Sequence, residues 1–224
     1  MRSYFDHNAT TPPDPAVVEA VVRALRDEFG NPSSVHHFGQ RAKALLDEAR
    51  SSVAELIGAE PGDVVFTSGG TESDNMALRG AAEAAEAAGA RRHVVASAIE
   101  HEAVLNTVKA LTRRGWTSTL LPVDASGVVS PAALAAVVTP QTAIVSVMHA
   151  NNEIGTIQPI ADLAAIAHEH GALFIRTPYS RSRRFPSTCG RSGSICCRSR
   201  RTSSTDRRAR ARSGSAAARG SFRR

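Results

Sequence analysis

The sequence predicts an α/β fold in which helices flank a mainly parallel sheet. Two observations carry this prediction. Short apolar segments alternate with segments of helical periodicity between residues 63 and 174, a pattern typical of parallel strands joined by helices. The alternation stops at Phe174, beyond which Arg, Ser, Gly and Pro dominate. We therefore expect an incomplete sheet domain over residues 1–174 and a separate tail over residues 175–224.

Two helices are expected before the sheet. From Pro15 to Gly30, apolar residues recur at helical spacing until Gly30-Asn31-Pro32 interrupts the pattern. A second amphipathic helix is expected from His37 to Ile57, with Gly58 at its end.

The first strand is expected at Asp63-Val-Val-Phe-Thr67, followed by a glycine turn and an Ala-rich helix that ends near Gly89. Further strands are expected at His93–Ser97, Thr117–Pro122, Thr142–His149 and Ala172–Phe174. Helices are expected between most of them, at His101–Arg114, Pro131–Val138 and Ile160–Gly171.

Charge divides the chain at the same boundary. The formal net charge of +6 combines a tail of +14, with fifteen Arg and the single acid Asp206, and a body of −8. The tail cannot bury enough apolar surface to offset the entropy that folding would cost. We therefore expect the Arg/Ser-rich tail to be disordered.

Cysteine and histidine are also divided at Phe174, because all eight His precede it and all three Cys follow it. The pair Cys196-Cys197 does not have the spacing of zinc ligands, and we expect no metal site. The N-terminus has no apolar segment of the signal-peptide kind, and no run is long enough to span a bilayer. We expect a cytoplasmic protein without a membrane partner.

Two strings at strand ends could hold a ligand. Ser68-Gly69-Gly70-Thr71 places small residues where a strand meets a helix, and N–H groups there can bind a phosphate. The alternative is a plain turn capped by Thr71 or Ser73. His101 follows another strand, at the edge where sheets of this class bind ligands, and could stack on an aromatic cofactor. The alternative there is a surface histidine.

A third string, from Val147 to Gly155, ends a hydrophobic strand with the polar cluster Asn151-Asn152-Glu153. Several amide and acid groups converge on this strand end. The alternative is a turn in which the Asn side chains bond their own backbone.

These strings form an ordered set with Phe5-Asp-His-Asn-Ala-Thr-Thr-Pro12 and Gly30-Asn-Pro-Ser-Ser-Val-His36, and the set resembles the cysteine desulfurases over residues 3–174. Those enzymes belong to the class V aminotransferase superfamily and use pyridoxal 5'-phosphate (PLP). The resemblance implies the large domain of PLP fold-type I. It also implies that Gly70 and Thr71 bind the phosphate, that His101 stacks on the pyridine ring and that Asn152 lies beside the ring oxygen.

The resemblance further implies a substrate and partners. Intact relatives take sulfur from L-cysteine, leave alanine and an enzyme persulfide, and pass the sulfur to acceptor or scaffold proteins for iron–sulfur clusters or other uses. They are typically homodimers. The pattern of the whole family also requires a lysine that holds PLP, an aspartate that pairs with the pyridine nitrogen and a mobile cysteine.

This sequence departs from the family at those three residues. After Phe174 the family continues with His-Thr-Asp-Ala-x-Gln-Ser, where this chain has Ile175-Arg-Thr-Pro-Tyr-Ser-Arg181. The ring-binding aspartate is therefore replaced, and the PLP-holding lysine and the persulfide cysteine are not retained. We expect no catalytic residue in the chain, and hence no activity.

The tail is interpreted as the family's own continuation read in another frame. Permitted codons for Ile175–Arg181, shifted by one base, encode His-Thr-Asp-Ala-Val-Gln-Ser. The same shift across Ile195–Ala209 gives a segment that resembles the PLP-lysine region. A single-base deletion near the Phe174 codon explains both segments. The basic charge of the tail then results from codons that are read out of frame. The alternative is an arginine-rich nucleic-acid arm at Ser180–Arg184 and Arg207–Arg212, which we disfavour.

Two other functions stay open. Another class V PLP enzyme, such as a selenocysteine lyase or an aminotransferase, would share most of residues 3–174. A non-catalytic pseudoenzyme or binding subunit is the alternative from a different functional class.

Overall fold

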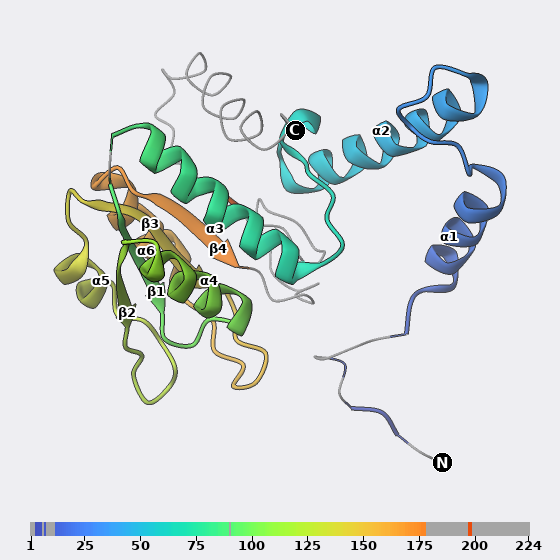
Figure 1. The fold of residues 1–224 in the computed structure, drawn as a ribbon. Coiled ribbons are helices and arrows are strands. Elements are labelled where there is room, and N and C mark those ends of the chain that lie inside the picture. The colour runs from blue at the N-terminus through green and yellow to red at the C-terminus, as the bar shows by residue number, and fades with distance from the viewer. Residues whose placement is uncertain (1–2, 6, 8–11, 90, 178–196, 199–224) are drawn as a thin grey trace. The chain divides into compact units, whose positions relative to one another are not determined.

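A computed structural model of the protein describes residues 3–5, 7, 12–89, 91–177 and 197–198. The chain divides into two compact units, one formed chiefly by residues up to Val65 and the other beginning at Phe66 (Figure 1). Of the tail, only residues 175–177 and 197–198 are described. The predicted disorder of the remaining tail residues therefore lies outside the described residues.

The second unit is built on a five-stranded sheet in the order β2-β1-β3-β4-β5. The strands are β1 (His93–Ser97), β2 (Thr117–Leu121), β3 (Thr142–Met148), β4 (Leu173–Thr177) and β5 (Cys197–Arg198). The pairs β1–β2, β1–β3 and β3–β4 are parallel, whereas β5 pairs with β4 in the antiparallel direction. The prediction of a mainly parallel sheet is confirmed.

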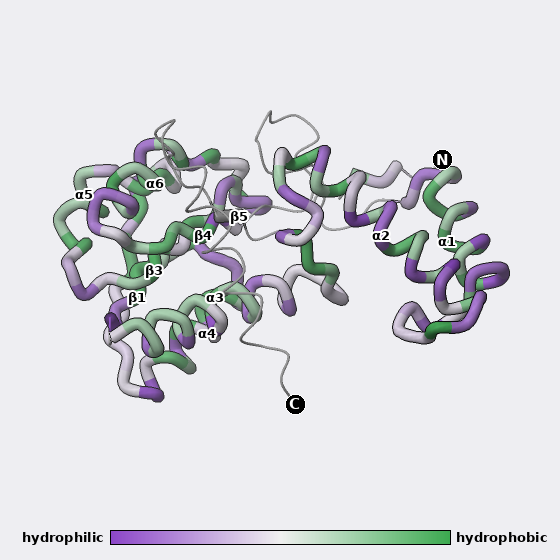
Figure 2. Tube along the Cα trace, turned by 90° about the horizontal axis from the view of Figure 1, so that it is seen from above, coloured by the Kyte–Doolittle hydropathy of each residue, from purple (hydrophilic) through white to green (hydrophobic). Residues whose placement is uncertain are grey.

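Helices cover both faces of this sheet. Figure 2 shows α3 (Gly70–Ala87) and α4 (Glu102–Arg113) on one side of the strands, and α5 (Pro131–Val137) and α6 (Ile160–Glu169) on the other. All seven residues of β3 are buried, as a parallel strand between two helical layers requires. The four predicted helices of this unit are thereby confirmed, with ends that differ by a few residues.

The core has two parts because successive residues of a strand point to opposite faces. On the side of α3 and α4, buried residues include Leu78, Val94, Val108 and Ile144. On the side of α5 and α6, they include Val95, Leu134, Val145, Leu163 and Phe174. Val94 and Val95 are adjacent in sequence yet belong to different parts, so the sheet itself separates the two cores.

In the first unit, α1 (Pro15–Asp27) begins where Asp14 caps it, because its Oδ1 accepts a hydrogen bond from the N–H of Ala16 at 2.9 Å. No residue of α1 is buried. Its apolar side chains are instead exposed, from 44% for Val18 to 76% for Leu25. The predicted amphipathic helix forms, but its apolar stripe is not covered within the described part of the chain.

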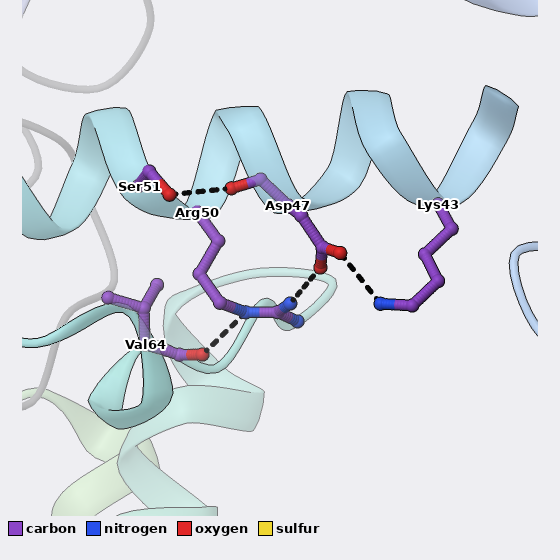
Figure 3. Close-up of polar contacts among 5 residues, drawn as sticks. All are labelled: Lys43, Asp47, Arg50, Ser51 and Val64. Carbon is purple, nitrogen blue, oxygen red and sulfur yellow. Dashed lines mark hydrogen bonds and ion pairs between the residues drawn. The ribbon is translucent and has the colours of Figure 1, made fainter. Parts of the chain in front are cut away.

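The helix α2 (His37–Ile57) has the predicted bounds. Gly58 ends it in the left-handed conformation, with φ +66°, which glycine adopts without steric cost. Figure 3 shows that the Arg50 Nε donates to the carbonyl oxygen of Val64 at 3.2 Å, while Asp47 accepts from Lys43 and Arg50. This contact ties α2 to the segment that follows the short 3-10 helix η1 (Pro61–Asp63).

The predicted strand at Asp63–Thr67 is wrong. Asp63 closes η1, and residues 64–67 belong to no strand. The backbone of Val64 is extended, but its carbonyl accepts from Arg50 rather than from a neighbouring strand. Val65 and Phe66 are 52% and 45% exposed. An apolar run becomes a strand only where another strand pairs with it, and none of the described strands does so here.

The last parallel strand extends beyond the predicted junction. We expected a strand that ends at Phe174, whereas β4 continues through Thr177, with Ile175 opposite Ser146 and Thr177 opposite Met148. Ladder hydrogen bonds join backbone groups and depend little on side-chain identity. The sheet therefore extends over three residues that differ from the family pattern.

The buried side chain of Leu78 provides a test of this core. Leu78 is fully buried between α3 and the sheet, whereas Leu120 on β2 is 53% exposed. We expect Leu78→Ala to lower the free energy of unfolding by about 2–5 kcal/mol through lost burial and a residual cavity. The control Leu120→Ala should cost less than about 1 kcal/mol. Urea unfolding followed by circular dichroism measures both, and equal losses would contradict the assigned core.

Candidate cofactor site

The start of α3 lies where the phosphate-binding turn is expected. Gly69 precedes the helix in extended backbone, and among the described residues no side chain caps the helix there. A Cβ built on Gly69 meets no atom within 4 Å, so the backbone is open to a ligand. Gly70 is half-buried and Thr71 is exposed. First-turn N–H groups of such a helix can bind a phosphate.

Side chains around this turn hold its shape. Oε2 of Glu72 accepts hydrogen bonds from the N–H of Ser68 at 2.6 Å and from its hydroxyl at 2.7 Å. These two bonds lower the pKa of Glu72, the hydroxyl contributing most. The hydroxyls of Thr67 and Ser73 are 2.7 Å apart. Glu72 and Ser73 therefore hold the turn that precedes α3 without capping the helix.

Asn75 connects this turn to the next helix. Its Nδ2 donates to the carbonyl oxygen of Thr71 at 2.8 Å, and its Oδ1 accepts from the hydroxyl of Thr107 on α4 at 2.8 Å. Thr107 is 2% exposed. The first turn of α3 is thus held against α4, the helix that follows His101.

His101 is the N-cap residue of α4. Its Nδ1 accepts a hydrogen bond from the N–H of Ala103 at 3.1 Å, and the side chain is exposed. The imidazole therefore stands beyond the carboxyl end of β1 with its ring accessible. The cap assigns the unprotonated nitrogen to Nδ1, which leaves the proton of the neutral ring on Nε2.

The two asparagines after β3 differ in role. Oδ1 of Asn151 accepts from the N–H groups of Glu153 at 2.9 Å and Ile154 at 3.1 Å. Its Nδ2 donates to the carbonyl oxygen of Ile99 at 3.3 Å. Asn151 therefore forms the turn and links it to the loop before His101. Asn152, the expected ring contact, is half-buried on the same turn.

Two contacts link the segments that carry the expected residues. The turn with Gly70 and Thr71 is held against α4 through Asn75, and the turn with Asn152 is held against the loop after β1 through Asn151. His101 lies in sequence between Ile99 and Thr107, the partners in these two contacts. His101 and Asn152 thus belong to the segments that follow the carboxyl ends of β1 and β3.

Sequence reasoning missed Glu100. This residue is 5% exposed, and its two carboxylate oxygens accept hydrogen bonds from the hydroxyls of Ser146 and Thr177, each at 2.8 Å. Burial raises the pKa of Glu100 to about 7, with a smaller contribution from Asp74. A serine in the middle of the apolar strand β3 was the available signal, because a buried hydroxyl needs a partner.

Two further side chains shape the electrostatics of this edge. His149 follows β3, and its backbone N–H donates to the carbonyl oxygen of Thr177 at 2.9 Å. Burial lowers the pKa of His149, and the charge of Arg176 lowers it further. The imidazole is therefore neutral near pH 7. Arg176 is 7% exposed within β4, so the edge combines a buried acid with a buried cation.

The described residues suit the binding of PLP, but they do not include the aspartate and lysine that its chemistry requires. The uncapped start of α3 suits a phosphate, and the accessible ring of His101 suits stacking. Thr177 stands where the family pattern has aspartate, and its hydroxyl donates to Glu100. The sequence has two lysines, of which Lys43 pairs with Asp47 on α2 and Lys109 lies exposed in the second half of α4.

The described residues show neither a metal site nor a membrane-spanning helix. No group of three or more His, Cys, Asp or Glu side chains there could hold a metal ion. The helices in that part of the chain are also too short or too polar to cross a membrane.

Comparison with known proteins gives one family. Residues 3–176 match the family described as aminotransferase class-V. A cysteine desulfurase IscS of Dictyoglomus turgidum is 46% identical over 171 residues, which cover 76% of this chain and 43% of that protein. A putative cysteine desulfurase IscS 1 of Bacillus subtilis is 43% identical over 173 residues, covering 77% and 45%. The chain therefore spans less than half the length of these relatives.

Solved structures give the same result. A NifS-like protein superposes with a TM-score of 0.75 at 40% identity, covering 79% of this chain and 48% of that one. SspA in complex with cysteine superposes with a TM-score of 0.73 at 36% identity, covering 78% and 50%. The expected fold, the PLP fold-type I sheet in incomplete form, is confirmed.

The link through Asn75 can be tested by substitution. We expect Asn75→Ala to be less stable than Asn106→Ala by about 0.5–1.5 kcal/mol, because it removes a bond to Thr71 and one of the two acceptors of the buried Thr107 hydroxyl, which keeps the carbonyl oxygen of Ala103. Asn106 is an exposed residue of α4, so both variants make the same gain in helix propensity. Urea unfolding compares the two, and equal stabilities would show that the link contributes nothing.

The buried Glu100 should make stability depend on pH. The folded chain keeps its proton up to about pH 7, whereas the unfolded chain loses it near 4.5. The contribution of Glu100 is therefore fully present below pH 4.5 and lost as the pH rises toward 7. At about 1.4 kcal/mol per pH unit, the loss is roughly 3 kcal/mol.

Glu100→Gln cannot titrate, so its free energy of unfolding should gain on that of the parent chain by this amount between about pH 4.5 and pH 8. Urea unfolding across this range measures the difference. Parallel pH profiles of the two proteins would contradict the burial of a protonated Glu100.

Proposed function

Because the chain belongs to the class-V aminotransferase family, we propose that residues 1–174 are the N-terminal part of the large domain of a PLP-dependent cysteine desulfurase. The observation that supports this proposal is the pair of contacts that link the start of α3 to α4 and the turn after β3 to the loop before His101. The identity to cysteine desulfurases over these same residues supports the choice of reaction.

Four residues of this chain would hold the cofactor. Gly70 and Thr71 would bind the phosphate through the first turn of α3, with Asn75 holding that turn in place. His101 would stack on the ring, its orientation fixed by the bond from the N–H of Ala103. Asn152 would lie beside the ring oxygen. When bound, PLP supplies an electron sink for the bonds around an amino-acid α-carbon.

The same residues do not complete the chemistry. Thr177 offers a hydroxyl rather than a carboxylate where the ring nitrogen needs an ionised partner, and that hydroxyl is engaged by Glu100. Lys109 lies exposed in the C-terminal half of α4, away from the N-terminal end that His101 caps. We therefore propose that the 224-residue chain can bind PLP without a covalent bond and is inactive as a desulfurase.

A frameshift near the Phe174 codon accounts for the missing groups. The family match ends at residue 176, the charge changes sign at the same place, and less than half of each relative is covered. β4 nevertheless continues to Thr177. Residues 175–224 would then be a tail without a selected role.

The intact form would act on L-cysteine and transfer sulfur to acceptor or scaffold proteins, for iron–sulfur clusters or other sulfur transfer. We propose a cytoplasmic homodimer for that form. These partners follow from the relatives and not from contacts of this chain. SspA was solved in complex with cysteine, which supports this substrate class.

Restoring one base after the Phe174 codon tests the function. With PLP and L-cysteine, we expect the frame-restored protein to form sulfide and alanine, and the 224-residue chain to form neither. Sulfide detection and amino-acid analysis measure the two products. Amino-group transfer without sulfide would identify an aminotransferase, and activity only on selenocysteine would identify a lyase.

Sequencing the locus provides an independent control, because an intact frame without a missing base would exclude the deletion. Covalent PLP in the purified 224-residue chain would contradict the proposed loss of the lysine.

A further inference from the structure

Glu100 is bonded to two strands of the sheet. Its oxygens accept from Ser146 of β3 and Thr177 of β4, both at 2.8 Å. Glu100 itself follows β1 by three residues and directly precedes His101, the N-cap residue of α4. One buried side chain therefore links the loop between β1 and α4 to β3 and β4.

These bonds are buried and involve no cation among the described residues. Glu100, Ser146 and Thr177 are 5%, 0% and 3% exposed. Removing either partner of such a buried bond leaves the other without a hydrogen bond, which lowers the free energy of unfolding. Hydroxyl groups can donate or accept, so these partners suit either ionisation state of the carboxyl group.

The consequence for the cofactor site runs through His101. The Nδ1 of His101 accepts from the N–H of Ala103, and the residue before His101 is Glu100, whose carboxyl group is bonded to β3 and β4. The backbone that carries the imidazole is therefore anchored to two strands through its neighbour. Without Glu100, the loop before α4 loses these two bonds.

The residue at position 177 determines which hydrogen bond Glu100 can form with it. The Thr177 hydroxyl donates a hydrogen bond to Glu100 here, whereas an ionised aspartate, as in the family pattern, can only accept one. Two carboxyl groups at this spacing share one proton, because both cannot ionise together at low cost. Glu100 would then keep the proton and donate a hydrogen bond to the aspartate.

We propose that Glu100 is a positioning residue for the cofactor site, and that its protonated carboxyl group donates a hydrogen bond to residue 177 when that residue is an ionised aspartate. This inference rests on the proposed function, since it assigns a support to the ring-binding groups. Glu100 itself touches neither ring nor substrate in this assignment. It acts through His101 and through residue 177.

Other charged and titratable groups lie on the elements that surround Glu100. They are Asp74 of α3, His101 of α4, His149 after β3 and Arg176 of β4. Asp74 raises the pKa of Glu100, and Arg176 acts on His149. None of them changes in the variants below, so differences between variants report on Glu100 and residue 177.

The first experiment measures urea unfolding of the full 224-residue chain against pH. The variants are Thr177→Asp, Glu100→Gln with Thr177→Asp, and the uncharged control Thr177→Val. We expect the unfolding midpoint of Thr177→Asp to fall as the pH rises above neutrality, because the shared proton is lost. The double variant should lose this fall, since the amide of Gln donates without titrating. Identical pH profiles for Thr177→Asp and the double variant would overturn the proposed donation.

The second experiment measures PLP binding to the same chain by the circular dichroism induced in the cofactor's visible band. We expect Glu100→Ala to weaken binding about tenfold, the effect of one lost supporting bond, and Glu100→Gln to restore it. The matched control Glu102→Gln, an exposed neighbour on α4, should bind as the parent does. Parental affinity in a folded Glu100→Ala variant would overturn the positioning role.

The two experiments separate this inference from the proposed function. If the parent chain gives no induced signal with PLP, the proposed cofactor site fails, while the pH profiles still decide whether Glu100 and residue 177 share a proton. If PLP binds and the profiles are identical, the Glu100 inference fails alone. Should Glu100→Ala not fold, Glu100→Gln with Thr177→Asp carries the decision.

Discussion

The burial of β3 on both faces is the constraint on which the second unit depends. A strand with seven buried residues needs a helical layer on each side and a strand at each edge. Helical crossovers satisfy this requirement and return the chain in the same direction each time. The carboxyl ends of β1, β3 and β4 therefore meet at one edge. The polar residues that follow these strands lie at that edge because the strands run in the same direction.

Much of this could be predicted from the sequence because the signals are local. The helical periods, the glycine turns and the polar strings at strand ends each lie within a few residues of what they specify. The strand expected at Asp63–Thr67 failed for a different reason. Its apolar run is local, but a strand needs a partner, and the described strands supply none.

Glu100 could not be assigned for the same physical reason. Its partners Ser146 and Thr177 are 46 and 77 residues away in sequence, and only the parallel pairing brings them together. His101 is adjacent to Glu100 and was predicted because it belongs to a recognisable string. The supports of a site are thus harder to predict than its ligand contacts, since they are defined by tertiary neighbours.

The course of β4 has a consequence for how such genes change. The strand between residues 173 and 177 is held by peptide groups, whose pairing depends little on side-chain identity, whereas chemistry depends on the side chains themselves. A deletion at this point would change the side chains of residues 175–177 and leave their pairing with β3 in place. At this strand, the requirements of folding and of catalysis are therefore separable.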